Sequence, residues 1–260
     1  MNPASAMQSS PAPTAPDTSR PILQLTDIWQ RFGGLVANAE VTFDVPRGQI
    51  LGLIGPNGAG KSTLFGIIAG ARAPVQGQVV FEGRDVTRLD APARCTLGIA
   101  RTYQVPRSFD SMSVLDNVMV GSFSRHTRAA AAREAALEVL DFTGLIGRAA
   151  ASAGDLTPPE KRRLEVARAL ATEPRLLLLD EVMTGLTPSE ARKGVELIRR
   201  IRDRGITVIM VEHVMEIVMP LVDRAIVLNL GRVLSQGAPH DVVRDPAVVA
   251  AYLGDRHRAA

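Results

Sequence analysis

A glycine-rich segment carries the strongest chemical signal in the sequence. Its residues are Gly55, Pro56, Asn57, Gly58, Ala59, Gly60, Lys61 and Ser62, in the pattern G-x-x-x-x-G-K-[ST]. Glycines let successive backbone N–H groups curl around a phosphate, and a following helix adds the positive end of its dipole. We expect Lys61 to contact the β- and γ-phosphates, Ser62 to ligate Mg²⁺ and Thr63 to lie near the α-phosphate. The segment predicts a site for ATP and Mg²⁺.

Two adjacent carboxylates end an apolar run farther along the chain. Residues 176–179 are four leucines, and Asp180 and Glu181 follow them. An aspartate at the end of a buried strand can hold Mg²⁺ through water, and a neighbouring glutamate can orient and deprotonate the attacking water. His213 follows a second apolar run, residues 206–211, and would reach the same sheet edge as a γ-phosphate sensor, although a lone histidine there is more often structural. The two carboxylates, Asp180 and Glu181, together with the glycine loop, favour hydrolysis of the nucleotide over its storage.

The elements that must position these groups predict an α/β fold. Apolar runs without alternation are typical of parallel strands buried on both faces. The expected strands are residues 22–29, 41–45, 49–54, 78–81, 176–179, 206–211, 225–229 and 233–235. Helical character dominates from about 91 to 171, and capping boxes at Thr157–Glu160 and Thr187–Glu190 open two helices. The expected helices are residues 61–69, 113–120, 129–140, 160–171, one after Thr187, and one near the C-terminus through residue 253.

Composition limits the class of protein and its setting. The 260 residues carry a formal charge of +3, spread along the chain, so nothing favours nucleic acid as a partner. No apolar run approaches the roughly 18 residues of a membrane span. The single Cys95 excludes an internal disulfide and suits a reducing compartment. Residues 1–21, rich in Pro, Ser, Ala and Thr, are expected to be a disordered tail, and the cytoplasm is the expected location.

These motifs, in this order, resemble the ATP-binding cassette (ABC) transporter ATPases from about Ile22 to Gly254. The resemblance implies a P-loop NTPase core with an N-terminal β subdomain and an inserted α-helical subdomain at about 105–171, in one domain spanning 22–254 before a short basic tail at 255–260. It implies that Phe32 stacks on adenine and that Gln104 meets Mg²⁺ and links to the helical lobe. By the same resemblance His213 is the switch histidine, Asp180 the Mg²⁺ aspartate and Glu181 the catalytic glutamate.

Three further segments resemble the ATPases of branched-chain amino-acid importers. They are residues 31–35 (Arg-Phe-Gly-Gly-Leu), residues 185–188 (Gly-Leu-Thr-Pro) and residues 251–254 (Ala-Tyr-Leu-Gly). Importers for urea, amides or aromatic acids share this pattern. The implied assembly is two ATPase subunits beneath two permease subunits on the inner face of the membrane, with an extracytoplasmic substrate-binding protein.

One segment departs from the family pattern. Where a Leu-Ser-Gly-Gly-Gln signature is expected, the chain has Leu156, Thr157, Pro158, Pro159 and Glu160. The prolines have no N–H to donate to a phosphate, and a carboxylate replaces an uncharged amide. Two lost hydrogen bonds to a charged group would weaken the composite site by roughly two to four decades. We therefore expect a heterodimer with an unlike ATPase that supplies an intact signature.

Other functions fit parts of the sequence. A nucleotide-gated scaffold with little turnover suits the altered signature but not the intact Glu181. A cassette protein of DNA repair or translation usually has two cassettes or long coiled-coil insertions, which this chain lacks. A small-molecule kinase leaves Gln104, His213 and the helical insertion unexplained.

Overall fold

The computed structural model describes residues 20–212 and 215–256 and contains two sheets with helices packed around them. The predicted tail (1–21) therefore lies almost wholly outside the described residues, as do His213 and residues 257–260 of the basic tail. Within the described residues, no helix is long and apolar enough to cross a membrane.

The larger sheet has six strands in the order β10-β9-β3-β8-β7-β6. Its strands are β3 (Ile50–Ile54), β6 (Ile99–Arg101), β7 (Leu176–Asp180), β8 (Thr207–Val211), β9 (Arg224–Asn229) and β10 (Arg232–Gly237). Five of them are parallel, and β10 pairs with β9 in the antiparallel sense. The residues of β3, β7 and β8 are buried throughout, as expected for parallel strands covered on both faces.

The smaller sheet is antiparallel, in the order β2-β1-β4-β5. Its strands are β1 (Leu23–Phe32), β2 (Leu35–Val45), β4 (Gln76–Phe81) and β5 (Arg84–Asp85). The first two strands are longer than predicted and meet in a tight turn, because Phe32 pairs directly with Leu35. The added residues include exposed ones, so apolar content alone did not reveal them.

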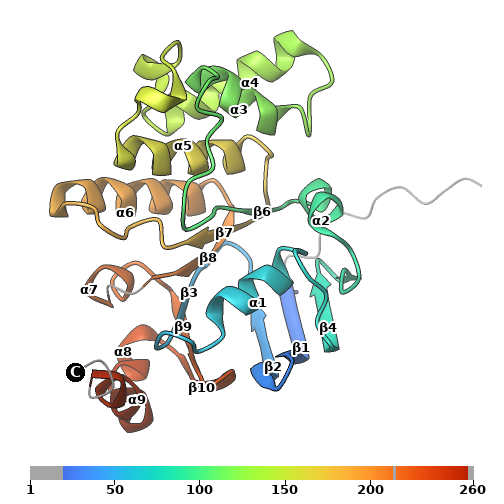
Figure 1. Cartoon of the computed structure of the whole chain (residues 1–260), viewed down its shortest axis with the longest axis vertical. Helices are drawn as coiled ribbons and strands as arrows, with labels where there is room; N and C mark the ends of the chain where they lie inside the picture. The colour runs from blue at the N-terminus through green and yellow to red at the C-terminus, as the bar shows by residue number, and fades with distance from the viewer. Residues whose placement is uncertain (1–19, 213–214, 257–260) are drawn as a thin grey trace, which may run out of the picture.

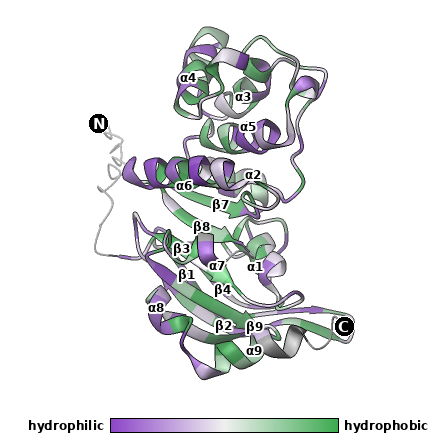
Figure 2. Ribbon diagram, turned by 90° about the vertical axis from the view of Figure 1, so that its left-hand side faces the viewer, coloured by the Kyte–Doolittle hydropathy of each residue, from purple (hydrophilic) through white to green (hydrophobic). Residues whose placement is uncertain are grey.

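Helix α1 (Lys61–Ile68) lies between the two sheets. Its Leu64, Phe65, Ile67 and Ile68 pack in one core with side chains of both sheets. The opposite face of the larger sheet is covered by α5 (Pro158–Leu170), α6 (Pro188–Asp203), α8 (Pro239–Val242) and α9 (Pro246–Arg256). Hydrophobic central strands and a hydrophilic outer surface on α6 are visible in Figure 2. The core thus fixes α1 against the sheet that bears β7.

A group of helices stands at one end of the molecule. Helices α3 (Val114–Ser122), α4 (Ala129–Phe142) and α5 share a separate hydrophobic core, and α6 lies beneath them (Figure 1). Ser113 caps α3 and the predicted capping boxes open α5 and α6. Two short helices, α2 (Ala91–Leu97) and α7 (Met215–Val218), lie outside this group. The region expected to be helical from 91 contains β6, whose three residues join the core sheet beside β7.

Candidate functional site

The glycine loop, Asp180 and Glu181 lie at the carboxyl edge of the larger sheet. In the register of the parallel strands, Leu53 of β3 pairs with Val211 of β8, and Val211 pairs with Asp180 of β7. Strand β6 continues this edge, with Arg101 beside Leu178. The ends of parallel strands in such a sheet form the usual ligand-binding crevice. The glycine loop and the acidic pair therefore meet although they are more than a hundred residues apart.

The glycine loop runs from the end of β3 to the start of α1. Gly55, Gly58 and Gly60 all have positive φ, at 147°, 77° and 99°. A Cβ on Gly55 would lie 2.1 Å from the Leu228 carbonyl oxygen, and one on Gly60 would lie 2.3 Å from that of Ala37. Backbone conformation and close packing thus both require glycine at Gly55 and Gly60. Within the loop, the Ala59 N–H donates to the Pro56 carbonyl oxygen at 3.2 Å.

Lys61 is buried at the start of α1 and turns back over the loop. Its ammonium donates to the carbonyl oxygens of Gly55 at 2.6 Å and Pro56 at 2.8 Å. Ser62 is exposed and Thr63 is half-buried in the first turn of the same helix. A buried cation, a helix N-terminus and two hydroxyl-bearing residues thus follow one another at the end of the loop, which suits a polyphosphate.

The two carboxylates after β7 have different partners. Asp180 is buried, its carboxylate accepts a 2.8 Å hydrogen bond from Arg101, and its N–H donates to the Thr102 hydroxyl. Glu181 has φ of 51°, a conformation uncommon for a residue with a Cβ. Its N–H donates to the Val211 carbonyl oxygen at 2.9 Å, which ties it to the end of β8. The adjacent acids Asp180 and Glu181 therefore contact different neighbours.

Gln104 lies against the second acid. Its side-chain amide donates to the Glu181 carboxylate at 2.7 Å. Gln104 begins the segment that leads from β6 toward α3, so this contact joins the end of β7 to the path into the helical group. The sequence analysis did not predict this hydrogen bond between Gln104 and Glu181.

Phe32 occupies the rim of the smaller sheet. Its ring is partly exposed, and the Arg72 guanidinium lies 5.0 Å from the ring centroid. Asn38, on the strand after the Phe32 turn, donates to the Gly60 carbonyl oxygen at 3.3 Å. The strand next to Phe32 therefore touches the glycine loop. His213 lies outside the described residues, directly after the described end of the β8 segment.

Glu212 is a site residue that the sequence analysis did not single out. One of its carboxylate oxygens accepts a 2.7 Å hydrogen bond from the Met183 N–H, and the other is buried without a hydrogen-bond partner within the described residues. Burial raises the pKa of Glu212 to about 7; the Met183 hydrogen bond lowers it, and the charge on Glu181 raises it further. In the sequence, only the position of Glu212 one residue before His213 could have indicated that it belongs to the site.

Tyr252 of α9 brings the C-terminus to the glycine loop. Burial raises the pKa of the Tyr252 hydroxyl, and a hydrogen bond from the Gly55 N–H lowers it. The sequence analysis used this residue only as part of a family resemblance. The structure gives it a contact with the first glycine of the loop.

The start of α5 holds its polar groups within its own first turn. Glu160 accepts hydrogen bonds from the Thr157 N–H and hydroxyl, each at 2.9 Å, and its other oxygen lies 3.5 Å from Arg148. The Thr157 N–H bond is the main cause that lowers the pKa of Glu160. Pro158 and Pro159 have no N–H. The segment is a well-formed helix start with few donors left for a phosphate.

These residues fit ATP with Mg²⁺. The loop is a cradle that a Cβ would fill, and its cation is buried. Among the residues that the structure describes, no cluster of three or more His, Cys, Asp or Glu side chains could hold a metal alone. Mg²⁺ is usually held by one or two carboxylates together with substrate phosphates, so Asp180 and the Ser62 hydroxyl suit it.

Comparisons with known proteins agree with this geometry. Residues 39–184 match the ABC transporter family, and residues 232–258 match the branched-chain amino acid ATP-binding cassette transporter family. The high-affinity branched-chain amino acid transport ATP-binding protein LivG of Salmonella typhimurium is 36% identical over 253 residues, covering 91% of this chain and 99% of LivG. Its counterpart BraF of Pseudomonas aeruginosa is also 36% identical, over 91% of this chain and 99% of BraF.

A solved structure shares the fold. An ATP-binding cassette of an ABC transporter in its ADP conformation superposes with a TM-score of 0.83 at 30% identity, covering 90% of this chain and 99% of that one. A buried parallel strand that feeds a glycine loop, with two acids at the end of another parallel strand of the same sheet, is typical of the P-loop ATPases. Within that class, this chain belongs to the ABC transporter family and is an ATP-binding cassette ATPase.

Proposed function

We propose that this chain is the ATP-hydrolysing subunit of an importer for branched-chain or other hydrophobic amino acids or related small polar compounds. The match of residues 232–258 to the branched-chain amino acid cassette family carries the proposal, because it extends the likeness beyond the shared ATPase core. The contact between Tyr252 of that region and Gly55 supports it by linking the subfamily segment to the nucleotide loop.

In this account each residue has a distinct task at the site. Gly55, Pro56, Asn57, Gly58, Ala59 and Gly60 supply the phosphate loop. Lys61 binds the β- and γ-phosphates, Thr63 lies near the α-phosphate, and Phe32 stacks on adenine. Ser62 and Asp180, with Gln104, would hold Mg²⁺, which would neutralise phosphate charge.

Hydrolysis depends on a water molecule placed by the chain. Glu181 orients it and accepts its proton, and His213 contacts the γ-phosphate. Gln104 already bonds Glu181 at 2.7 Å, so loss of that bond when nucleotide binds would be transmitted along the segment toward α3. Relative motion of the helical group would then act on a permease.

The proposed partners are two permease subunits, a second and unlike ATPase, and an extracytoplasmic substrate-binding protein; no nucleic acid is involved. The chain would lie in the cytoplasm, on the inner face of the membrane, through the permeases. The closed capping box at Thr157 and Glu160, with its two prolines, supports an unlike partner that supplies the intact signature.

The same capping box favours an alternative function. In this alternative, the chain is a catalytically weak nucleotide-binding subunit that mainly holds the dimer together. The intact Glu181, with its hydrogen bond from Gln104, supports hydrolysis over this alternative.

Co-expression with candidate permeases, ATPases and binding proteins tests the proposed function. We expect this chain to co-purify with a permease pair and an unlike ATPase, and uptake of a hydrophobic amino acid to require all of them. The isolated chain should hydrolyse ATP at least tenfold more slowly than the assembly. Brisk hydrolysis by a homodimer, or failure to bind any permease, would contradict the proposal.

A further inference from the structure

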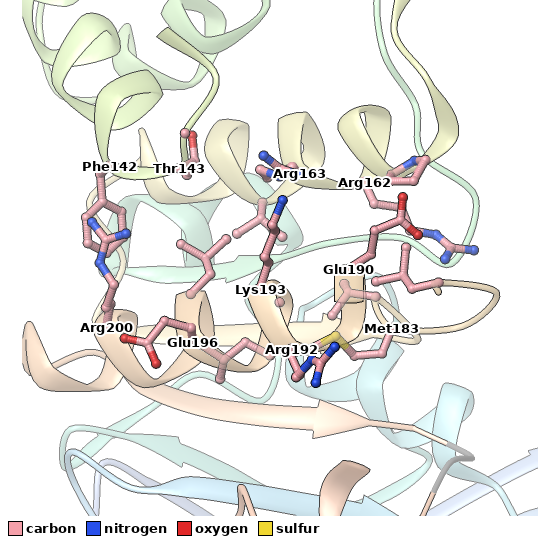
Figure 3. Close-up of a pocket in the computed structure, with 18 of the residues that line it drawn as sticks. Phe142, Thr143, Arg162, Arg163, Met183, Glu190, Arg192, Lys193, Glu196 and Arg200 are labelled. Atoms are coloured by element: carbon pink, nitrogen blue, oxygen red, sulfur yellow. The ribbon is translucent and has the colours of Figure 1, made fainter. Parts of the chain in front are cut away.

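A pocket lies where the helical group meets the core, away from the glycine loop. It has a volume of about 480 Å³ and lies between α5 and α6, bounded by the segment after β7 and the end of α4 (Figure 3). That volume is within the usual range of small-molecule sites, roughly 300–1,000 Å³. The phosphate loop, Gln104, Asp180 and Glu181 do not line it, whereas Pro159 at the start of α5 and Met183 do.

The inner wall of the pocket is apolar. It is formed by Phe142, Val166, Met183, Leu186, Leu197 and Ile198. Phe142, Val166, Met183 and Ile198 are buried, so the wall is continuous with the core that covers the larger sheet. A ligand here would place an apolar body against a preformed surface.

The rim carries an excess of positive charge. Its cations are Arg162, Arg163, Arg192, Lys193 and Arg200, against the carboxylates of Asp141, Glu190 and Glu196. Arg200 lies over the Phe142 ring at 4.5 Å. Across the described ranges, 20–212 and 215–256, the other four cations make no side-chain hydrogen bond or ion pair.

Two of these cations face the same space from opposite walls. In Figure 3 the Lys193 side chain extends from α6 toward α5, where Arg163 lies. Both charges act on Glu190, whose pKa is lowered first by hydrogen bonds from Thr187 and then by Lys193 and Arg163. Because Glu190 is held in the capping box of α6, its carboxylate is already engaged with Thr187.

We propose that this pocket binds a small amphipathic carboxylate, with its apolar body on the Val166–Leu197 wall and its head group between Arg163 and Lys193. An anion there would interact with both cations, and an arginine fork pairs well with a carboxylate. Neither an uncharged apolar molecule nor a small hydrophilic anion satisfies both walls.

The ligand bridges two segments of the nucleotide site. Helix α5 begins at the Thr157 capping box, and Met183 follows Glu181 by two residues. A bound carboxylate would hold α5 against α6 and the segment after β7. This regulatory consequence rests on the proposed function, whereas the binding itself does not.

Calorimetric titration of the full chain without nucleotide tests the site. We expect octanoate to bind with one site per chain and a dissociation constant below about 1 mM. 1-Octanol lacks the charge and acetate lacks the apolar body, so each should bind at least tenfold more weakly. Absence of octanoate binding, or equal binding of octanol, would overturn the proposal.

Variants locate the site. Lys193→Gln and Arg163→Gln should each weaken octanoate binding at least fivefold, whereas Lys161→Gln removes the same charge from α5 outside the pocket and should change it less than twofold. Lys61→Ala should also retain binding, which excludes the phosphate loop as the site. Circular dichroism of each variant checks that the fold is kept. Unchanged affinity in both pocket variants, or loss in Lys61→Ala, would refute the assignment.

Discussion

Asp180, the proposed Mg²⁺ ligand, forms an ion pair with Arg101. Their 2.8 Å ion pair is nearly inaccessible to solvent, at 7% and 16% side-chain exposure. Without a metal, Arg101 neutralises a carboxylate that would otherwise be a buried charge. The proposed Mg²⁺ at Asp180 would supply the same neutralisation, so the arginine and the metal act on one carboxylate.

Loss of the Arg101–Asp180 ion pair should destabilise the nucleotide-free chain. Arg101→Gln should lower the free energy of unfolding by about 3 kcal/mol without nucleotide, because it leaves Asp180 buried and unpaired. Mg²⁺ with ATP should restore more stability to this variant than to the wild type. Urea unfolding with and without Mg²⁺–ATP measures both effects. Adding Asp180→Asn should recover part of the loss; a double variant no more stable than Arg101→Gln would contradict this account.

Glu212 gives a prediction about pH. Burial raises its pKa from 4.5 to about 7 in the folded chain, so the folded state keeps a proton that the unfolded state releases near pH 4.5. Stability is therefore lost as pH rises from about 4.5 to about 7, and the full penalty, on the order of 3 kcal/mol, applies above that.

Glu212→Gln removes this titration while keeping an acceptor for the Met183 N–H. The variant should gain about 2 kcal/mol relative to wild type between pH 5 and pH 8, measured by urea unfolding without nucleotide. An equal difference in unfolding free energy at the two pH values would show that Glu212 does not hold its proton.

Helix α1 illustrates how an element is held in place. Its C-terminal end is bound by Arg94, which is fully buried and donates to the carbonyl oxygens of Ile67 at 2.6 Å and Ile68 at 2.8 Å. The same guanidinium donates to Val86 and Thr87. Arg94 thus fixes the helix whose other end bears Lys61, and burial lowers its pKa to about 10.

The prediction for this element is a loss of stability. Arg94→Lys keeps the charge but loses the fork that serves several carbonyls, so it should lower the unfolding free energy by about 3 kcal/mol. Arg88→Lys, at an exposed site in the same connection, should change it by less than about 0.5 kcal/mol. Equal effects of the two substitutions in urea unfolding would contradict the role given to Arg94.

Local patterns predicted the parts of the site that lie within one segment. The glycine loop, its flanking strand and helix, and the two capping boxes depend on neighbouring residues, so the sequence specified them. The Arg101–Asp180 pair joins residues 79 apart, and β6 becomes a strand by pairing with β7. Those features depend on long-range packing, which periodicity does not encode. Family resemblance suggested Gln104 as a site residue, but its bond to Glu181 joins residues 77 apart and was not predicted.

At the scale of the whole molecule, the nucleotide site is built asymmetrically. The phosphate loop, Asp180, Glu181 and Gln104 lie together at one sheet edge, whereas the start of α5 uses its polar groups to cap itself. In a dimer, this chain would supply complete hydrolytic residues to one composite ATP site and a weak signature segment to the other. That asymmetry is the physical basis for the proposed unlike partner.

The most direct test compares matched substitutions in the assembled transporter. Glu181→Gln in this chain should reduce steady-state ATP hydrolysis and uptake at least 100-fold while ATP still binds, since the carboxylate acts on the attacking water. The corresponding Glu→Gln change in the unlike ATPase should reduce hydrolysis less than tenfold, because its nucleotide would face Thr157–Glu160. Near-normal hydrolysis with Glu181→Gln, together with its loss on changing the partner, would contradict the account.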